Sequence, residues 1–420
     1  MGKGRKEPLL PSKAAALARC VSRPDDELRS FRSCLRWMCV DQSTALHSAV
    51  SWSLFVLLAV VVPLVSHFLL ECSERRRPYD AVVQLSLTAA SALAFLCLSV
   101  SLRKYGLRRF LFLDKICGES EHVRSGYSVE LNRSFRILSC FVMPCFVVEL
   151  VYKVYLYWAG ARQVPYLGNA VAIHALAFAS ELASWAYRTA IFYLVCVLFR
   201  LTCQLQILRL QEFTEVFHHE SEVAVVLGEH LRIRRHLVII SHRFRKFIIA
   251  GLAIVTVSQF ATLLLTTRPR AVIDLLDTGE LALCSAGLLT GLLICLRSAA
   301  RITHKAQALT SHASKWHVCA TTDSFNADPE ATPPVVSSND EDEESDEDSA
   351  EDELECTKLV QPHANTISFQ KRQALVTYLE NNMAGITLFG FVLDRGYLHT
   401  IFMFELSLVL WLLGKTIGIS

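Results

Sequence analysis

The chain has 420 residues, of which 52% are hydrophobic and 20% are charged, and its formal net charge is +2. Soluble domains average about 45–50% apolar and about 25% charged residues, so this composition excludes an ordinary soluble enzyme and a wholly disordered chain. Twelve of the 40 acidic residues lie between Asp340 and Glu355, which leaves 42 basic against 28 acidic residues elsewhere. These features predict a multi-spanning membrane protein with one acidic insert.

Seven apolar runs are long enough to cross about 30 Å of hydrocarbon, which takes about 20 helical residues. We expect spans at 45–70, 82–102, 138–158, 170–203, 247–265, 278–296 and 397–419. The run Tyr166–Phe199 is too long for one upright helix and too short for two, so we interpret the fourth span as one helix that projects beyond the bilayer. The alternation of a β-barrel is absent. The predicted fold class is therefore all-α, a seven-transmembrane helical bundle.

Lysine and arginine counts set the expected orientation. The segments 1–44, 103–137, 206–246 and 297–396 hold 32 basic residues, whereas the connections on the other side hold seven. The positive-inside rule then predicts a cytosolic N-terminus and, with seven spans, an exoplasmic C-terminus. No cleavable signal peptide is expected, because the N-terminal arm is polar and basic. The chain is thus expected to be integral to the plasma membrane or an endomembrane, with the lipid bilayer as a partner.

Outside the spans we expect mainly cytosolic mass. Residues 1–44 form a basic arm, and apolar residues at helical spacing in 204–246, 297–315 and 367–386 predict cytosolic helical extensions within 45–320 and in 363–396. Residues 321–362 are acidic and poor in apolar side chains, so they are predicted to be disordered. Within them Ser345 and Ser349 each have an acidic residue three positions on, a pattern suited to acid-directed kinases. The alternative is a solvated linker. Residues 397–420 hold the last span and a short exoplasmic tail.

Ionisable residues inside spans three and four predict a ligand pocket in the outer half of the membrane. Such groups cost about 2.5–3.5 kcal/mol each on insertion scales, so they require an explanation. Glu149 and Lys153 are four residues apart, which also allows a self-neutralising pair, and positions 181, 185 and 188 share one helix face. The alternative is an interfacial aromatic belt with structural ion pairs. The candidate ligand residues are Glu149, Tyr152, Lys153, Glu181, Trp185 and Arg188.

The last span carries a small, partly polar stripe. Thr400, Ser407 and Gly414 are spaced by seven residues, and Phe404 and Trp411 lie beside them. Such a stripe either packs closely against another helix or lines a narrow water path when several copies surround an axis. Glu405 faces elsewhere and is expected to need a partner from another span.

No motif of a common enzyme class is present: the sequence has no Walker loop, no GxSxG, no kinase set and no HExxH. The histidines at 218, 219, 230, 236 and 242 do not form a His-x3-His set on one helix face, so no metal site is expected. We therefore expect no enzyme activity, no cofactor and no nucleic-acid partner.

The span count, the short outer loops, the helical extensions and the final span together resemble the insect odorant and gustatory receptor superfamily. The stretch GITLFGFVLDRGYLHTIFMFELSLVLWLLGKTIGI, Gly385–Ile419, is more similar to the land-plant gustatory-receptor-like family of unknown function. The resemblance implies a homotetramer with the last spans around a central pore, an intracellular anchor, and a small-molecule pocket among the first six spans. The last span lacks the Gln-Phe pair of the insect receptors.

Three hypotheses follow. The first is a ligand-gated cation channel subunit with Thr400, Phe404, Ser407 and Trp411 near the pore. The second is a non-conducting receptor or adaptor that signals through the cytosolic helices and the acidic insert. The third is a small-molecule transporter that uses the intramembrane ionisable residues, although the sequence shows no clear repeat.

Overall fold

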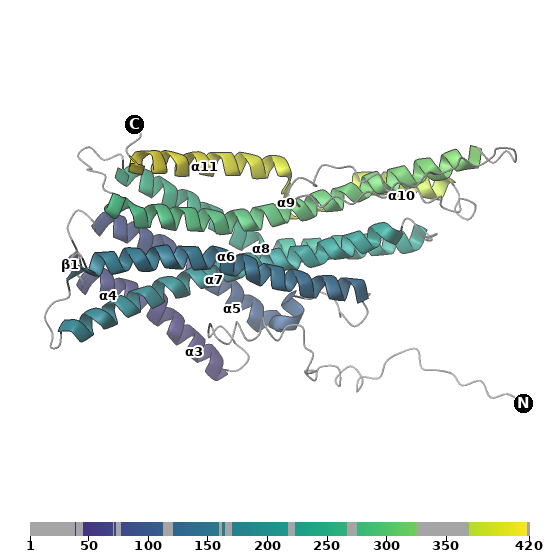
Figure 1. Ribbon diagram of the computed structural model, residues 1–420. Helices are drawn as coiled ribbons and strands as arrows, with labels where there is room; N and C mark the ends of the chain where they lie inside the picture. Colours follow the sequence, from purple (N-terminus) through teal and green to yellow (C-terminus); the bar gives the residue numbers. More distant parts are fainter. Residues whose placement is uncertain are drawn as a thin grey trace, which may run out of the picture.

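The computed structural model describes residues 45–69, 71–72, 77–111, 121–158, 162–163, 170–216, 223–266, 275–325 and 369–417, together with Met38. The described chain is almost entirely helical, and its long helices run side by side as one elongated bundle (Figure 1). The basic arm and most of the acidic insert, including Ser345 and Ser349, lie outside the described residues.

The elements of the described chain are mostly long helices, with a few two-residue strands between them. The first span comprises α3 (Ala45–Val56), a π-helical turn η1 (Leu57–Val61) and α4 (Val62–Leu69). The long helices are α5 (Arg77–Leu111), α6 (Glu121–Trp158), α7 (Ala170–Val216), α8 (Val223–Thr266) and α9 (Leu275–Phe325). Strands β1 (Glu71–Cys72) and β2 (Arg162–Gln163) pair antiparallel, so the connections after the first and third spans lie at the same end of the bundle.

Six helices of the described chain are long and apolar enough to cross a membrane: 46–68, 78–104, 129–158, 172–214, 223–265 and 279–319. They overlap the first six predicted spans, and the fifth and sixth extend well beyond the predicted cytosolic ends. The seventh predicted span falls on α11 (Arg395–Ile417), a helix of 23 residues that is not among these six. The count of seven therefore stays a prediction.

Helix α7 is the centre of the bundle. It packs against α5, α6, α8 and α9, and its residues 191–207 are all buried except Arg200. A helix surrounded by other helices is apolar on every side, which explains why the fourth apolar run is so long. With 47 residues, α7 is about 70 Å long at 1.5 Å per residue, more than twice the thickness of the hydrocarbon core.

The segment between α9 and α11 departs from the prediction. Helix α9 continues to Phe325, beyond the predicted start of the acidic insert at 321, and α10 (Phe369–Asn381) ends before the predicted helix boundary at 386. Strands β3 (Thr387–Leu388) and β4 (Phe391–Val392) follow as an antiparallel hairpin. Phe389 and Gly390 form its turn with φ of 49° and 96°, the positive values that a tight hairpin turn needs. A helix cannot pass through these two residues.

Helix α11 packs on α8 and α9 at the edge of the bundle (Figure 1). Leu398 and Ile401 face the core, and the buried carboxylate of Glu405 accepts a hydrogen bond from Thr256 Oγ1 on α8 at 2.6 Å. The expected partner of Glu405 from another span is therefore Thr256.

Candidate functional site

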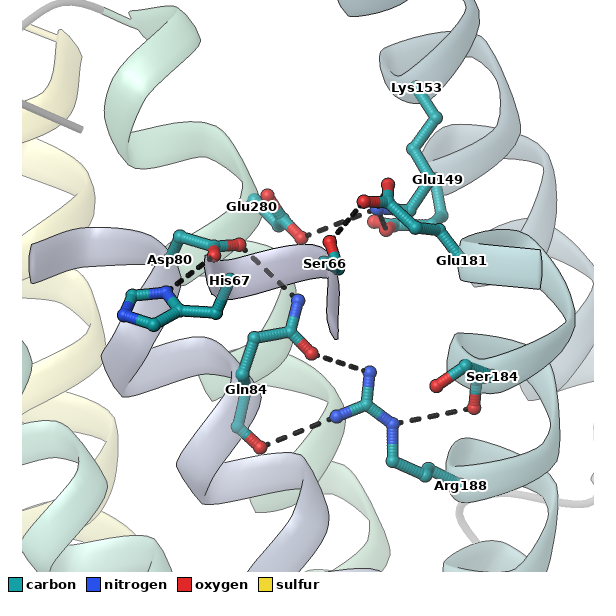
Figure 2. A network of polar contacts seen from close by, with 10 residues as sticks. All are labelled: Ser66, His67, Asp80, Gln84, Glu149, Lys153, Glu181, Ser184, Arg188 and Glu280. Carbon is teal, nitrogen blue, oxygen red and sulfur yellow. Dashed lines mark hydrogen bonds and ion pairs between the residues drawn. The ribbon is translucent and has the colours of Figure 1, made fainter. Parts of the chain in front are cut away.

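Lys153 is the centre of a buried ionic cluster. Its side chain is 2% exposed, and its Nζ lies 3.3 Å from Glu149 Oε1, 3.4 Å from Glu181 Oε2 and 3.8 Å from Glu280 Oε1. The three carboxyl groups come from α6, α7 and α9, and all are buried (Figure 2). Ser66 on α4 adds a hydrogen bond to Glu181. Ions far from water persist only when they are paired in this way, so the cluster ties four helices together.

Arg188 is the centre of a second polar group beside the first (Figure 2). Its Nη2 donates to Gln84 Oε1 at 2.7 Å, and its Nη1 donates to the Gln84 carbonyl at 3.3 Å and to Thr88 Oγ1 at 3.2 Å. Its Nε donates to the carbonyl of Ser184 at 3.3 Å. These four hydrogen bonds hold the buried guanidinium against α5 and its own helix.

Gln84 continues this group toward the end of the bundle. Its Nε2 donates to Asp80 Oδ1 at 3.3 Å, and Asp80 Oδ2 lies 3.5 Å from His67 Nδ1. His67 is the residue after Ser66, so α4 contacts both polar groups. The two groups together draw on α4, α5, α6, α7 and α9.

The first span has a break in its helical hydrogen bonding at Pro63, and side chains of the Arg188 group bond to the carbonyls at this break. Pro63 has no backbone N–H to donate to Leu58 in the π register or to Ala59 in the α register. The carbonyl of Leu58 instead accepts from Ser184 Oγ at 2.6 Å, and the carbonyl of Ala59 accepts from Thr88 Oγ1 at 3.1 Å. Since Thr88 and Ser184 also contact Arg188, the break and the Arg188 group are one structure.

A small cavity adjoins the Arg188 group. Arg188 and Trp185 line it with mostly apolar neighbours that include Leu87, Cys145, Phe192, Tyr193 and Cys284. Its volume is about 20 Å³, which is enough for about one water molecule. Drug-sized ligands occupy about 300–1,000 Å³, so a larger molecule requires side chains to move here.

The six predicted pocket residues lie in the ionic cluster, in the Arg188 group or next to them. Glu149, Lys153 and Glu181 meet in the ionic cluster, Arg188 lies in the second group, and Trp185 packs against Phe146 with ring centroids 6.4 Å apart. Tyr152 is half-buried on α6. Of the aromatic residues around them, Tyr155 and Trp158 point away from the bundle.

Sequence reasoning missed the other members: Ser66, His67, Asp80, Gln84, Thr88, Ser184 and Glu280. Glu280 lies two residues inside the predicted sixth span, Asp80 lies two residues before the predicted second span, and Gln84 lies two residues inside it. The sequence held a weaker indication of these residues. Four segments carry polar residues near the ends of spans on the predicted outer side. Their pairing depends on helix packing that the sequence does not show.

The predicted stripe of the last span faces away from the bundle. Thr400 and Ser407 are exposed, as are Phe404 and Trp411, and Gly414 is half-buried. Thr400 and Ser407 donate to carbonyls of their own helix, to Gly396 at 3.1 Å and to Phe404 at 2.7 Å. One face of α11 thus packs on the bundle and the other carries the stripe outward.

Comparisons with known proteins agree with this architecture. A family model described as "Protein of unknown function (DUF3537)" matches residues 26–404. The fold is similar to the insect olfactory receptor OR5 from Machilis hrabei. The complex with eugenol is 11% identical at a TM-score of 0.52, and a second structure of that receptor is 10% identical at 0.51. Each alignment covers 93% of this chain and 99% of the receptor chain. No curated protein matches the sequence.

Proposed function

This chain belongs to the DUF3537 family of unknown function, and we propose that it is a non-enzymatic subunit of a ligand-gated cation channel. Its integral membrane helices have the fold of an insect olfactory receptor. The proposal includes α11 as a seventh span, a cytosolic N-terminus, an exoplasmic C-terminus and a homotetramer. It also includes the closer relation to the land-plant gustatory-receptor-like family.

The observation that carries the proposal is the outward face of α11. Glu405 and Leu398 fix one side of this helix to the bundle, while Thr400, Ser407 and the aromatic rings of Phe404 and Trp411 face out. Both hydroxyls donate to their own helix, and their small side chains on this face suit a water path or a close contact between copies. Several copies of α11 around one axis provide both the water path and the contact between copies.

The ligand site that we propose is the cavity beside Arg188. Four of the five N–H groups of the guanidinium donate to described residues, and we propose that the fifth donates to an acceptor on a ligand. The other walls are mostly apolar. A small, mainly apolar molecule with one hydrogen-bond acceptor fits this chemistry. One of the two similar receptor structures is a complex with the small molecule eugenol.

Patch-clamp recording across a panel of such molecules tests the proposal. Protein in giant vesicles is expected to give ligand-dependent cation currents. Ser407→Leu is expected to lower the unitary conductance, whereas Leu85→Met, which changes an exposed residue of α5, leaves it unchanged. Tetramers that bind ligand but never conduct would overturn the channel and favour the receptor or adaptor.

The ionic cluster favours a transporter as the second candidate. Three carboxyl groups around one ammonium form the kind of intramembrane relay that moves protons or cations. Proton-coupled uptake by proteoliposomes that is lost on Glu149→Gln would support it. Uptake that does not depend on a pH gradient, together with ligand-gated currents, would exclude it.

A further inference from the structure

A second, larger opening lies between α6, α7, α9 and α11, and we name it the basic groove. Its volume is about 780 Å³. Its charged lining consists of Arg133, Arg200, Arg297, Arg301, Arg395 and His399. None of its described lining residues is acidic. Two described carboxylates adjoin lining residues: Glu130 pairs with Arg133 at 3.5 Å, and Asp394 accepts from the Arg395 backbone N–H. The groove thus retains a strong positive charge.

The arginines reinforce one another. The guanidinium of Arg200 lies in the field of the Glu130 carboxylate and of three like charges, those of Arg133, Arg297 and Arg301. Its Nε is buried, and none of the described residues accepts the N–H. Like charges gathered around an open volume are unfavourable unless an anion neutralises them. The groove therefore has the electrostatics of an anion site.

The groove is polar at one end and apolar at the other. On α6 the lining runs from Arg133 to Ile137 and Phe141, and on α11 it runs from Arg395 to Phe402. On α9, which is antiparallel to α6, the order reverses, from Thr290, Leu293 and Ile294 to Arg297 and Arg301. The basic residues of the helices therefore meet at one end and the apolar residues at the other. A ligand that fits both ends has an anionic head and a hydrocarbon chain.

The groove is separate from the ionic cluster. Along α9, Arg297 follows Glu280 by almost five helical turns, about 25 Å. This is most of the thickness of the hydrocarbon core, so the basic end lies toward the membrane surface that is farther from the cluster. In the predicted orientation that surface is cytosolic, where acidic lipids are concentrated.

We propose that the basic groove binds an acidic phospholipid, with the phosphate among the arginines and an acyl chain along Ile137, Phe141 and Phe402. The acidic insert of the same chain is the competing occupant. Its most acidic stretch, between Asp340 and Glu355, has only Ala350 and Leu354 as apolar residues, so this stretch matches the apolar end poorly. The proposal does not depend on ion conduction.

Binding to the full-length protein in detergent tests the proposal, with microscale thermophoresis as the readout. The probes are dioctanoyl phosphatidic acid, dioctanoyl phosphatidylcholine and glycerol 3-phosphate. We expect phosphatidic acid to bind at least tenfold more tightly than either of the others. The variant Arg297→Gln/Arg395→Gln removes two exposed guanidiniums and is expected to weaken that binding about thirtyfold, since each basic residue contributes about 1 kcal/mol near an acidic lipid.

Two further variants keep the result interpretable. Arg232→Gln/Lys246→Gln removes two exposed cations of α8 outside the groove and is expected to leave binding unchanged. Arg297→Lys/Arg395→Lys keeps the charge and should bind within about threefold of wild type if the electrostatic account is right.

Equal binding of the two lipids, or an unaffected glutamine variant, overturns the proposal. Equal binding of glycerol 3-phosphate identifies a free-phosphate site instead. Binding that appears only after deletion of 339–355 identifies the acidic insert as the occupant, and the lipid proposal fails.

Discussion

The hydroxyl of Thr88 donates a hydrogen bond, 3.1 Å long, to the carbonyl oxygen of Ala59, four residues before Pro63. Pro63 cannot donate to that carbonyl, so a side chain of α5 replaces the missing backbone donor. The same hydroxyl accepts from Arg188 Nη1 at 3.2 Å. Thr88 therefore connects the break in the first span to the buried guanidinium of α7.

Thr88→Val is expected to lower the free energy of unfolding by about 1–3 kcal/mol, because the Ala59 carbonyl and an N–H of Arg188 both lose a buried partner. Thr88→Ser keeps the hydroxyl and should retain most of the stability. Thermal unfolding of the purified protein, followed by tryptophan fluorescence, measures both. Equal melting temperatures for the valine variant and wild type would contradict the bonding described.

Lys153→Met is expected to destabilise the protein by about 3–5 kcal/mol, because it leaves three carboxyl groups buried without their shared cation. Glu280→Gln should cost less, because this carboxyl lies farthest from Nζ, at 3.8 Å. The fraction of monodisperse protein after heating, by size-exclusion chromatography, ranks the variants. A ranking in which Glu280→Gln is the worse of the two contradicts a cluster centred on Lys153.

Gly291→Ala is expected to lower stability by about 1–3 kcal/mol, because a Cβ at this position overlaps the Phe192 ring where α7 meets α9. Phe192→Leu should relieve the overlap, so the double variant is expected to be more stable than the additive sum of the two single changes. Gly279→Ala is the matched control on the same helix, since its Cβ meets nothing within 4 Å. Chemical denaturation monitored by fluorescence distinguishes them, and equal effects of the two alanine variants would refute the close approach.

Thr256→Val is expected to loosen α11, because the buried Glu405 carboxylate then loses a donor from the bundle. Hydrogen exchange of the peptides that cover 395–417 should become faster while α7 stays protected. Thr256→Ser, which keeps the hydroxyl, serves as the control. If exchange in α11 is the same in all three proteins, Glu405 does not hold this helix to the bundle.

Part of the site could be predicted from residue types and their spacing along the helices. The spacing of Glu149 and Lys153, four residues apart on one helix, allowed a self-neutralising pair as one alternative, and their ion pair is present at 3.3 Å. The common face of Glu181, Trp185 and Arg188 follows from helical spacing, and all three are buried. Glu280 could not be assigned in this way, because its partner is on another helix more than 100 residues away.

The hairpin before α11 is a feature that residue spacing predicted wrongly. Apolar residues at helical spacing extend to Ile386, but α10 ends at Asn381, and Ile386 and Thr387 donate their backbone N–H groups to Thr303 and Ser241. Spacing along the chain did not predict these side-chain acceptors, which α8 and α9 bring to the segment. Tertiary hydrogen bonds therefore overrode the local helical pattern.

The sequence by itself determined the membrane character of this protein, the first six helical segments and the charge asymmetry between their ends. These properties are local, because a helix in hydrocarbon satisfies its own backbone and needs only an apolar run of sufficient length. Only the tertiary structure decided which polar side chains meet: the three carboxyl groups on Lys153, the hydroxyls at the break before Pro63, and the five arginines of the basic groove. Each of these sets comes from several helices, and the order in which helices pack is decided by the shapes of all their faces together.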